Sequence, residues 1–233
     1  MDYKDEYIKK NPTLHIEDTP IKFSEIKTVL VSVGRVKTLL DVGCGAGVLT
    51  CKFADFLKSQ KALGVDISPS MIKEARAMNY LPDVVDFKCL DIFHLSHQKK
   101  FDLIICADII EHLNDDVKFL YKLKKLGHKI VIRVPLEDSL MNHFLKKAGV
   151  SNEFEKTEAR YGHVHHYSFD SFLRLVNLSG LKVESYLMYL INKKRTWWLN
   201  EILRQVTKIL GKVSVPLGVR FGGGFLVIVL TDN

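Results

Sequence analysis

The sequence has few cysteines, few prolines and no long apolar run, and each shortage excludes a class of protein. The longest apolar run, residues 225–230, is far too short to cross a bilayer as a helix. The charged start of the chain has no apolar core segment, so we expect no secretory signal. Repeats, low-complexity tracts and long linkers rich in proline, glycine or serine are also lacking. We therefore expect the 233 residues to form a single domain.

The cysteines indicate the redox state of the compartment, and the net charge bears on the possible partners. The four cysteines have no C-x-x-C spacing and fall within expected core elements: Cys44, Cys51, Cys89 and Cys106. This usage is typical of small buried thiols in a reduced, cytoplasmic protein, not of disulfides or a zinc site. The net charge of +7 permits nucleic acid, anionic lipid or an acidic substrate as a partner and indicates none of them.

Apolar runs alternate with helical patterns through the first part of the chain. The expected strands are residues 38–42, 61–67, 84–90, 101–107 and 129–134, the last broken by Pro135. Helices are expected at 21–33, from Pro69 to Met78 after a Ser68 cap, and from an Asn114 cap to Leu126. Such alternation predicts an α/β fold, a doubly wound parallel sheet with right-handed crossovers.

The tail departs from that alternation. We expect a helix at 136–148, a polar loop at 149–166, a helix at 169–178 capped by Ser168, and strands at 181–189 and 224–230. In the first of these helices four apolar residues are predicted to face inward: Leu140, Met141, Phe144 and Leu145.

A glycine-rich turn follows the first expected strand, in LLDVGCGAGVLT at residues 39–50. Glycine allows the positive φ of a turn and the close approach of a ligand to backbone N–H groups. The spacing is D-x-G-x-G-x-G, whereas a dinucleotide fingerprint is G-x-G-x-x-G. Asp41 at the strand end would repel a pyrophosphate and attract a cationic ligand.

This stretch resembles the first motif of class I S-adenosylmethionine-dependent methyltransferases, of the type 11 and type 23 kind. The resemblance implies a Rossmann-like seven-stranded sheet with an antiparallel last strand, and S-adenosylmethionine as cofactor with S-adenosylhomocysteine as product. In this interpretation residues 1–37 form an N-terminal helical segment before the sheet. Residues 38–135 form the cofactor-binding core, and residues 136–233 form the substrate-side cap and the closing strands. The last part includes a helical insertion at 192–220, to which the resemblance does not extend.

The resemblance also implies roles for acidic residues at the strand ends. Asp66, 19 residues beyond Gly47, would accept the ribose hydroxyls, although a helix N-terminal charge is the simpler interpretation. Asp91 would accept the adenine amino group, or merely begin a turn. Ile67 and Ile92 would lie on either side of the ring.

The methionine part of the cofactor would meet the other side of the same crevice. Asp41 would act on its ammonium group, and the turn would supply Gly43, Cys44, Gly45 and Gly47. After the fourth strand, Ala107 and Asp108 would face the same crevice.

Methyl transfer needs an aligned acceptor and a group that removes its proton. Carboxylates and imidazoles near the crevice are Asp108, Glu111, His112, His163, His165 and His166. We favour His112 and one of His165 or His166 as the base, while a histidine-rich loop is as often a scaffold.

A metal site is the alternative at the same place. Asp108-x-x-Glu111-His112 with a later histidine resembles the E-x-x-E-H…H site of small-RNA 2′-O-methyltransferases. The E-H pair also resembles ubiquinone-biosynthesis O-methyltransferases, which use a divalent ion. Because the first position here is Asp and the rest of the RNA enzymes' histidine motif is absent, we expect no metal.

Residues 193–213 form a basic amphipathic pattern. Apolar residues recur at helical spacing, and the basic residues on or near the other side are Arg195, Arg204, Lys208 and Lys212. Such a helix can lie at a membrane surface, cover the active site or contact a second subunit. The simplest interpretation is a helix packed on its own domain.

The sequence thus predicts a methyltransferase acting on a small-molecule, sugar or lipid-linked acceptor, with oxygen preferred. Nucleic acid is not expected as a partner. Three rivals stay open: an RNA 2′-O-methyltransferase with a metal site, a non-catalytic adenosyl-ligand binding protein, and a nicotinamide-dependent oxidoreductase, which the glycine spacing and Asp41 oppose.

Overall fold

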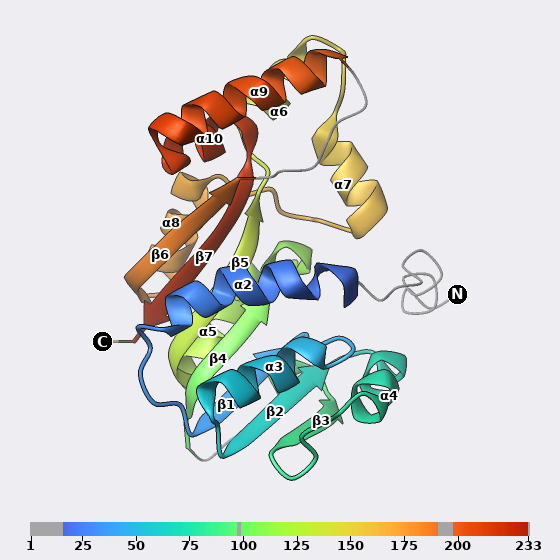
Figure 1. The fold of residues 1–233 in the computed structure, drawn as a ribbon, viewed down its shortest axis with the longest axis vertical. Helices are drawn as coiled ribbons and strands as arrows, with labels where there is room; N and C mark the ends of the chain where they lie inside the picture. Colours follow the sequence, from blue (N-terminus) through green and yellow to red (C-terminus); the bar gives the residue numbers. More distant parts are fainter. Residues whose placement is uncertain (1–15, 97–98, 191–197, 233) are drawn as a thin grey trace.

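The protein is a seven-stranded sheet with helices on both faces (Figure 1), described by a computed structural model for residues 16–96, 99–190 and 198–232. The strands are β1 (Thr38–Val42), β2 (Lys61–Asp66), β3 (Val85–Cys89), β4 (Phe101–Ala107), β5 (Gly127–Leu136), β6 (Lys182–Leu190) and β7 (Gly224–Thr231). Their order is β3-β2-β1-β4-β5-β7-β6. Strands β1 to β5 pair in parallel, and β7 is antiparallel to both of its neighbours. The predicted doubly wound sheet with an inserted last strand is confirmed.

Helices cover the two faces and one end of the sheet. They are η1 (Ile16–Asp18), α2 (Thr19–Leu30), α3 (Val48–Leu57), α4 (Pro69–Ala77), η2 (Ile92–His94), η3 (Ile110–His112), α5 (Asp116–Leu126), α6 (Leu140–Lys147), α7 (Glu153–Tyr161), α8 (Phe169–Leu178), α9 (Trp198–Val213) and α10 (Val215–Gly222). Helices α9 and α10 lie between the end of β6 and the start of β7, at the end of the sheet where β5 also ends (Figure 1).

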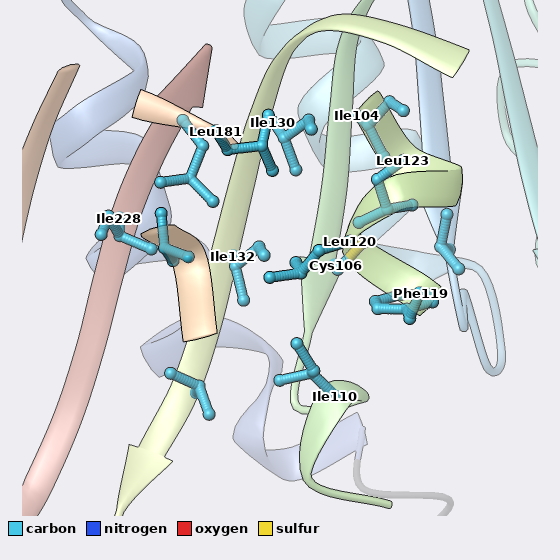
Figure 2. Close-up of a cluster of buried hydrophobic side chains, with 14 of the residues drawn as sticks. Ile104, Cys106, Ile110, Phe119, Leu120, Leu123, Ile130, Ile132, Leu181 and Ile228 are labelled. Atoms are coloured by element: carbon cyan, nitrogen blue, oxygen red, sulfur yellow. The ribbon is translucent and has the colours of Figure 1, made fainter. Parts of the chain in front are cut away.

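Two apolar clusters, one on each face, hold the layers together. In one, Ile104 and Ile132 of the sheet pack against Phe119 and Leu123 of α5 (Figure 2). The other joins the opposite sheet face to α2 and α3 and includes Phe53. Because successive strand residues point to opposite faces, β4 needs apolar residues on both, which explains its unbroken apolar run from Leu103 to Ala107 after Asp102.

Two sequence-based boundaries are corrected. The cap of α5 is Asp115, which accepts the Lys118 N–H over 2.9 Å, and not Asn114. A carboxylate there satisfies a free N–H and also meets the positive end of the helix dipole. Strand β5 continues through Pro135, because pairing with β4 ends at Arg133 and the strand then has a partner on one side only.

The interval 149–166 is not wholly a loop, since it contains α7. This helix buries none of its side chains, so it has no apolar periodicity for a sequence pattern to detect. In α6, Met141 and Leu145 are buried as predicted, but Leu140 and Phe144 are exposed, so the predicted inward face was too wide.

The cysteines are free thiols, and three of them are buried as predicted. Cys89 is exposed, because it ends β3, the strand at the edge of the sheet. Expectations for residues 1–15 and 191–197 lie outside the described residues. Within the described ranges, no helix combines the length and the apolar character that crossing a membrane requires.

Candidate functional site

A cavity of about 470 Å³ opens where β1, β2 and β4 end. Strand order reverses between β1 and β4, and open α/β sheets bind ligands outside the carboxyl ends of strands at such a reversal. The wall contains every residue that the sequence assigned to the cofactor, namely Asp41, Gly43, Cys44, Gly45, Gly47, Asp66, Ile67, Asp91, Ile92, Ala107 and Asp108.

The glycine turn (residues 43–47) forms one side of this cavity. The Gly43 N–H donates to the Val65 carbonyl over 2.8 Å, which ties the turn to β2. Gly47 has φ +75° and precedes α3, and a Cβ there would lie 2.5 Å from the Phe87 ring. A Cβ on Gly43 would collide with Ile109. Glycine is therefore required by both backbone conformation and space.

Asp66 lies where β2 ends and faces the turn. One carboxylate oxygen accepts the Gly45 N–H over 3.0 Å, and the other accepts the Ser68 N–H over 2.9 Å. Both oxygens of this carboxylate therefore help to fix the chain around the cavity, which Asp66 also lines. The helix cap of α4 is supplied by Ser68, as predicted.

The third side of the cavity is apolar with one acid. Asp91 accepts the Phe93 N–H over 2.9 Å at the start of η2 and also lines the cavity. Ile67 is 54% exposed and Ile92 is buried, and both contribute to the wall. This side of the cavity therefore offers apolar side chains together with one carboxylate.

Asp41 is a buried acid whose pKa lies near neutral pH. It is 4% exposed, and the Thr50 hydroxyl donates to it over 2.5 Å. Burial raises the pKa of Asp41 to about 7, against the lowering effect of the Thr50 hydrogen bond. A cationic group entering the cavity would favour the ionised form.

An ion-pair network surrounds Asp108, which has φ +57°. Lys22 Nζ lies 2.9 Å from the Asp108 carboxylate, and Arg133 donates to it over 2.6 Å. Arg133 also donates to Glu25 over 2.6 Å. Asp108 is half-buried, and although desolvation acts to raise its pKa, the charges of Lys22 and then Arg133 lower it. The sequence did not single out Lys22 or Arg133, because they come from α2 and β5 and meet Asp108 only in the folded chain.

Of the three predicted catalytic histidines, His112 alone lines the cavity within the described residues. Its Nδ1 lies 3.2 Å from the Gly162 carbonyl. Burial, and then neighbouring His163, lower the pKa of His112. His166 Nδ1 bonds Glu137 over 2.7 Å, and His165 stacks on Tyr167. The latter two histidines therefore hold the loop and are not brought to the cavity.

Next to the cavity the fold assembles what we call the Glu–His cluster: Glu111, His112 and His163. One potential ligand atom from each lies within 4.8 Å of the others. The loop after α7 is pinned there because the Val164 and His165 N–H groups donate to the Glu111 carbonyl. The sequence places residues 111–112 and 163 some 50 positions apart. The E-x-x-E-H…H resemblance indicated a later histidine without saying which one, and the fold brings His163 there.

Comparison with known proteins agrees with this geometry. A family model described as a methyltransferase domain matches residues 33–201. "Putative methyltransferase 235L" of Invertebrate iridescent virus 6 is 25% identical over 188 residues, which cover 77% of this chain and 69% of that protein.

Two further proteins extend the comparison. The ubiquinone biosynthesis O-methyltransferase of Idiomarina loihiensis is 35% identical over 101 residues. The match covers only 40% of this chain and 40% of that protein. The structure of magnesium protoporphyrin IX methyltransferase from Synechocystis PCC 6803, with bound S-adenosylhomocysteine, has a TM-score of 0.57 at 15% identity. The match covers 100% of this chain and 88% of that one, and it shows a shared fold.

Proposed function

The chain belongs to the family of S-adenosylmethionine-dependent methyltransferases, and we propose that it moves the methyl group to a hydroxyl oxygen of a small-molecule, sugar or lipid-precursor acceptor. One observation carries the proposal of the acceptor atom. A half-buried imidazole, His112, lines the cofactor cavity and has a neutral form favoured by its surroundings. A neutral imidazole beside the reacting groups is what deprotonation of a hydroxyl needs.

The residues of the cavity fit the cofactor. Its volume of about 470 Å³ is in the range of small-molecule sites. The glycine turn leaves room that a Cβ would fill at Gly43 and Gly47. Asp66, Asp91 and Asp41 line the cavity with carboxylates, the acceptor groups that suit the ribose hydroxyls, the adenine amino group and the ammonium group, respectively.

The cofactor supplies an electrophilic methyl group on a sulfonium sulfur. The chain supplies orientation and proton transfer. Because a carbonyl oxygen only accepts, the His112 Nδ1–H donates to Gly162, and Nε2 is the basic atom that takes the acceptor proton. The ion pairs of Asp108 with Lys22 and Arg133 hold the end of β4 in place beside it.

The exposed face of α9 is an argument for an acceptor that is held at or near a lipid surface. Helix α9 packs against α10, where buried Thr207 lies beside Gly222. Three apolar side chains remain exposed on it, Ile202, Ile209 and Val213. Exposed apolar residues next to lysines are typical of helices that lie at a membrane interface.

The test is methyl transfer from radiolabelled S-adenosylmethionine to three acceptor groups: phenolic or sugar hydroxyl compounds, the same head groups on lipid carriers in vesicles, and RNA. Transfer to a hydroxyl of the first or second group, lost in His112→Ala, supports the proposal. Transfer to a nitrogen or carbon atom, or to RNA alone, would reject it. The exposed histidine variant His128→Ala is the matched control.

A further inference from the structure

Helices α9 and α10 form a helical hairpin (residues 198–222) at the edge of the sheet where the cofactor cavity opens. Strand β6 is antiparallel to β7, which is antiparallel to β5, so β6 ends at the same edge as the parallel strands β1 to β5. The hairpin lies between the end of β6 and the start of β7 (Figure 1). Since the cavity opens where β1, β2 and β4 end, the hairpin and the cavity mouth share one edge.

The two helices of the hairpin pack closely through small residues. A Cβ added to Gly218 would lie 2.8 Å from the Gly211 Cα, and one added to Gly222 would collide with the buried Thr207 side chain. Thr207 and Gly211 are one turn apart on α9, as Gly218 and Gly222 are on α10. The side of α9 that carries residues 207 and 211 is therefore its inner side.

The outer side of α9 carries an apolar stripe: Ile202, Ile209 and Val213. These residues are seven and four positions apart, so they share one side of the helix. Ile209 is two positions from both Thr207 and Gly211, which places it about 200° around the axis from each of them. Ile209 is 62% exposed and Val213 is 77% exposed. Single exposed apolar side chains are common, but a stripe along one helix face indicates a contact outside the chain.

Two lysines flank this stripe. Lys208 and Lys212 each precede a stripe residue and so lie about 100° from it around the helix. Neither forms an ion pair with the described residues, whereas Arg204 is paired with Glu201, the one acid in the sequence of residues 198–222. An apolar stripe with a basic flank is complementary to an anionic bilayer, which offers acyl chains beneath negatively charged phosphates.

We propose that the hairpin docks on an anionic lipid bilayer, with the apolar stripe at the boundary of the acyl chains and Lys208 and Lys212 against lipid phosphates. The contact is peripheral, because within the described residues no helix is long and apolar enough to cross a membrane. Docking does not depend on methyl transfer. Its use rests on the proposed function, since docking turns the sheet edge with the cavity towards the surface where a lipid-linked acceptor lies.

The test is flotation of the full chain with vesicles of phosphatidylcholine alone and of phosphatidylcholine mixed with phosphatidylglycerol. We expect a vesicle partition coefficient that falls about 10-fold or more when phosphatidylglycerol is left out. Ile209→Ser/Val213→Ser should lower it about 30-fold or more on the mixed vesicles, because two side chains that enter the bilayer are lost. Lys208→Glu/Lys212→Glu should lower it by about 30-fold on the mixed vesicles, with little change on phosphatidylcholine.

The chain offers a matched control for each variant. Ile21→Ser/Val31→Ser changes two apolar residues of α2 that are 57% and 74% exposed. Lys73→Glu/Lys125→Glu changes the net charge equally, at exposed lysines of α4 and α5. Both controls should float as the wild-type chain does. Circular dichroism shows whether each variant remains folded.

Absence of flotation with the mixed vesicles overturns the proposal. So does flotation that the α9 variants keep, or that the controls lose to the same extent, because the lipid then binds elsewhere or responds to total charge alone. Sedimentation velocity tests a second copy of the chain as the occupant. A wild-type dimer that Ile209→Ser/Val213→Ser dissociates, without flotation, would show that a second copy covers the stripe.

Failure of docking and failure of the proposed function give different results. Flotation of a wild-type chain that does not bind S-adenosylhomocysteine would reject the methyltransferase site and leave the docking intact. Binding of S-adenosylhomocysteine without flotation would reject the docking and leave the cofactor site intact.

Discussion

The Gly45 N–H donates to a carboxylate oxygen of Asp66 over 3.0 Å, which joins the glycine turn after β1 to the end of β2. The other oxygen of the same carboxylate accepts the Ser68 N–H, at the start of α4. One acid thus orients two chain turns around the cavity and also lines it. Its two functions, holding the turn and binding a ligand, can be separated by substitution.

Asp66→Ala should weaken S-adenosylhomocysteine binding roughly 10- to 100-fold, because charge-assisted hydrogen bonds to the ligand and the anchor of the turn are both lost. Asp66→Asn keeps one acceptor oxygen, so its affinity for S-adenosylhomocysteine should lie between those of the wild-type and Asp66→Ala proteins. The control is Asp86→Ala, an exposed acid of neighbouring β3. Calorimetry measures the affinities. Equal affinity of wild-type and Asp66→Ala proteins would mean that the cofactor binds elsewhere.

Gly47→Ala should destabilise the fold more than a glycine substitution in open space. Gly149 has φ +66° and no neighbour within 4 Å of an added Cβ. Gly149→Ala should therefore lower the free energy of unfolding by about 1 kcal/mol, from backbone strain alone. At Gly47 the new Cβ also meets Phe87, which adds about 2 kcal/mol. Urea unfolding gives both values. Similar losses in the two variants would show that the turn has room for a side chain.

Asp41 should make stability and cofactor binding depend on pH in opposite directions. Because folding raises its pKa from 3.8 to about 7, its contribution to stability is greatest below pH 4 and falls as pH rises through 7. Ionised Asp41 attracts the cofactor ammonium, so S-adenosylhomocysteine should bind more tightly at pH 8 than at pH 6.

Asp41→Asn removes this titration and is the control. Its affinity for S-adenosylhomocysteine should change little between pH 6 and 8, and the stability difference between the two proteins should shrink or reverse as pH rises. Parallel pH profiles of wild-type and Asp41→Asn proteins would show that another group is responsible.

Arg133→Ala should lower the free energy of unfolding by about 3 to 5 kcal/mol, since Asp108 and Glu25 lose a buried partner. Arg220→Ala removes an exposed arginine paired with Asp170 and should change it by less than about 0.5 kcal/mol. Urea denaturation compares the two. A loss at Arg133 no larger than at Arg220 would show that the buried network adds nothing.

The sheet and its cofactor side were predictable from the sequence because their signals are local. The apolar run at 103–107 is long enough to identify a strand covered on both faces, and the strand predicted at 101–107 appears with the same bounds in the structure. The glycine turn, Asp66 and Asp91 follow their strands directly, so parallel pairing alone brings them to one edge.

The catalytic side was predicted less well because its contacts are distant in sequence. His163 reaches His112 only because the loop after α7 folds back on the Glu111 carbonyl. Helix α7 itself was missed, since it buries no side chain. The ion pair between Arg133 and Asp108 crosses from β5 to the end of β4, and a charge inside an apolar run gives no sign of its partner.

The central claim is that the cavity at the ends of β1, β2 and β4 holds S-adenosylmethionine. Its most direct test is calorimetric titration of the purified chain with S-adenosylmethionine, S-adenosylhomocysteine and NAD in parallel. We predict one site with micromolar-range affinity for both adenosyl ligands and no binding of NAD. Binding of NAD alone would contradict the account, and the roles given to Asp41, Asp66 and Asp91 would have to be withdrawn.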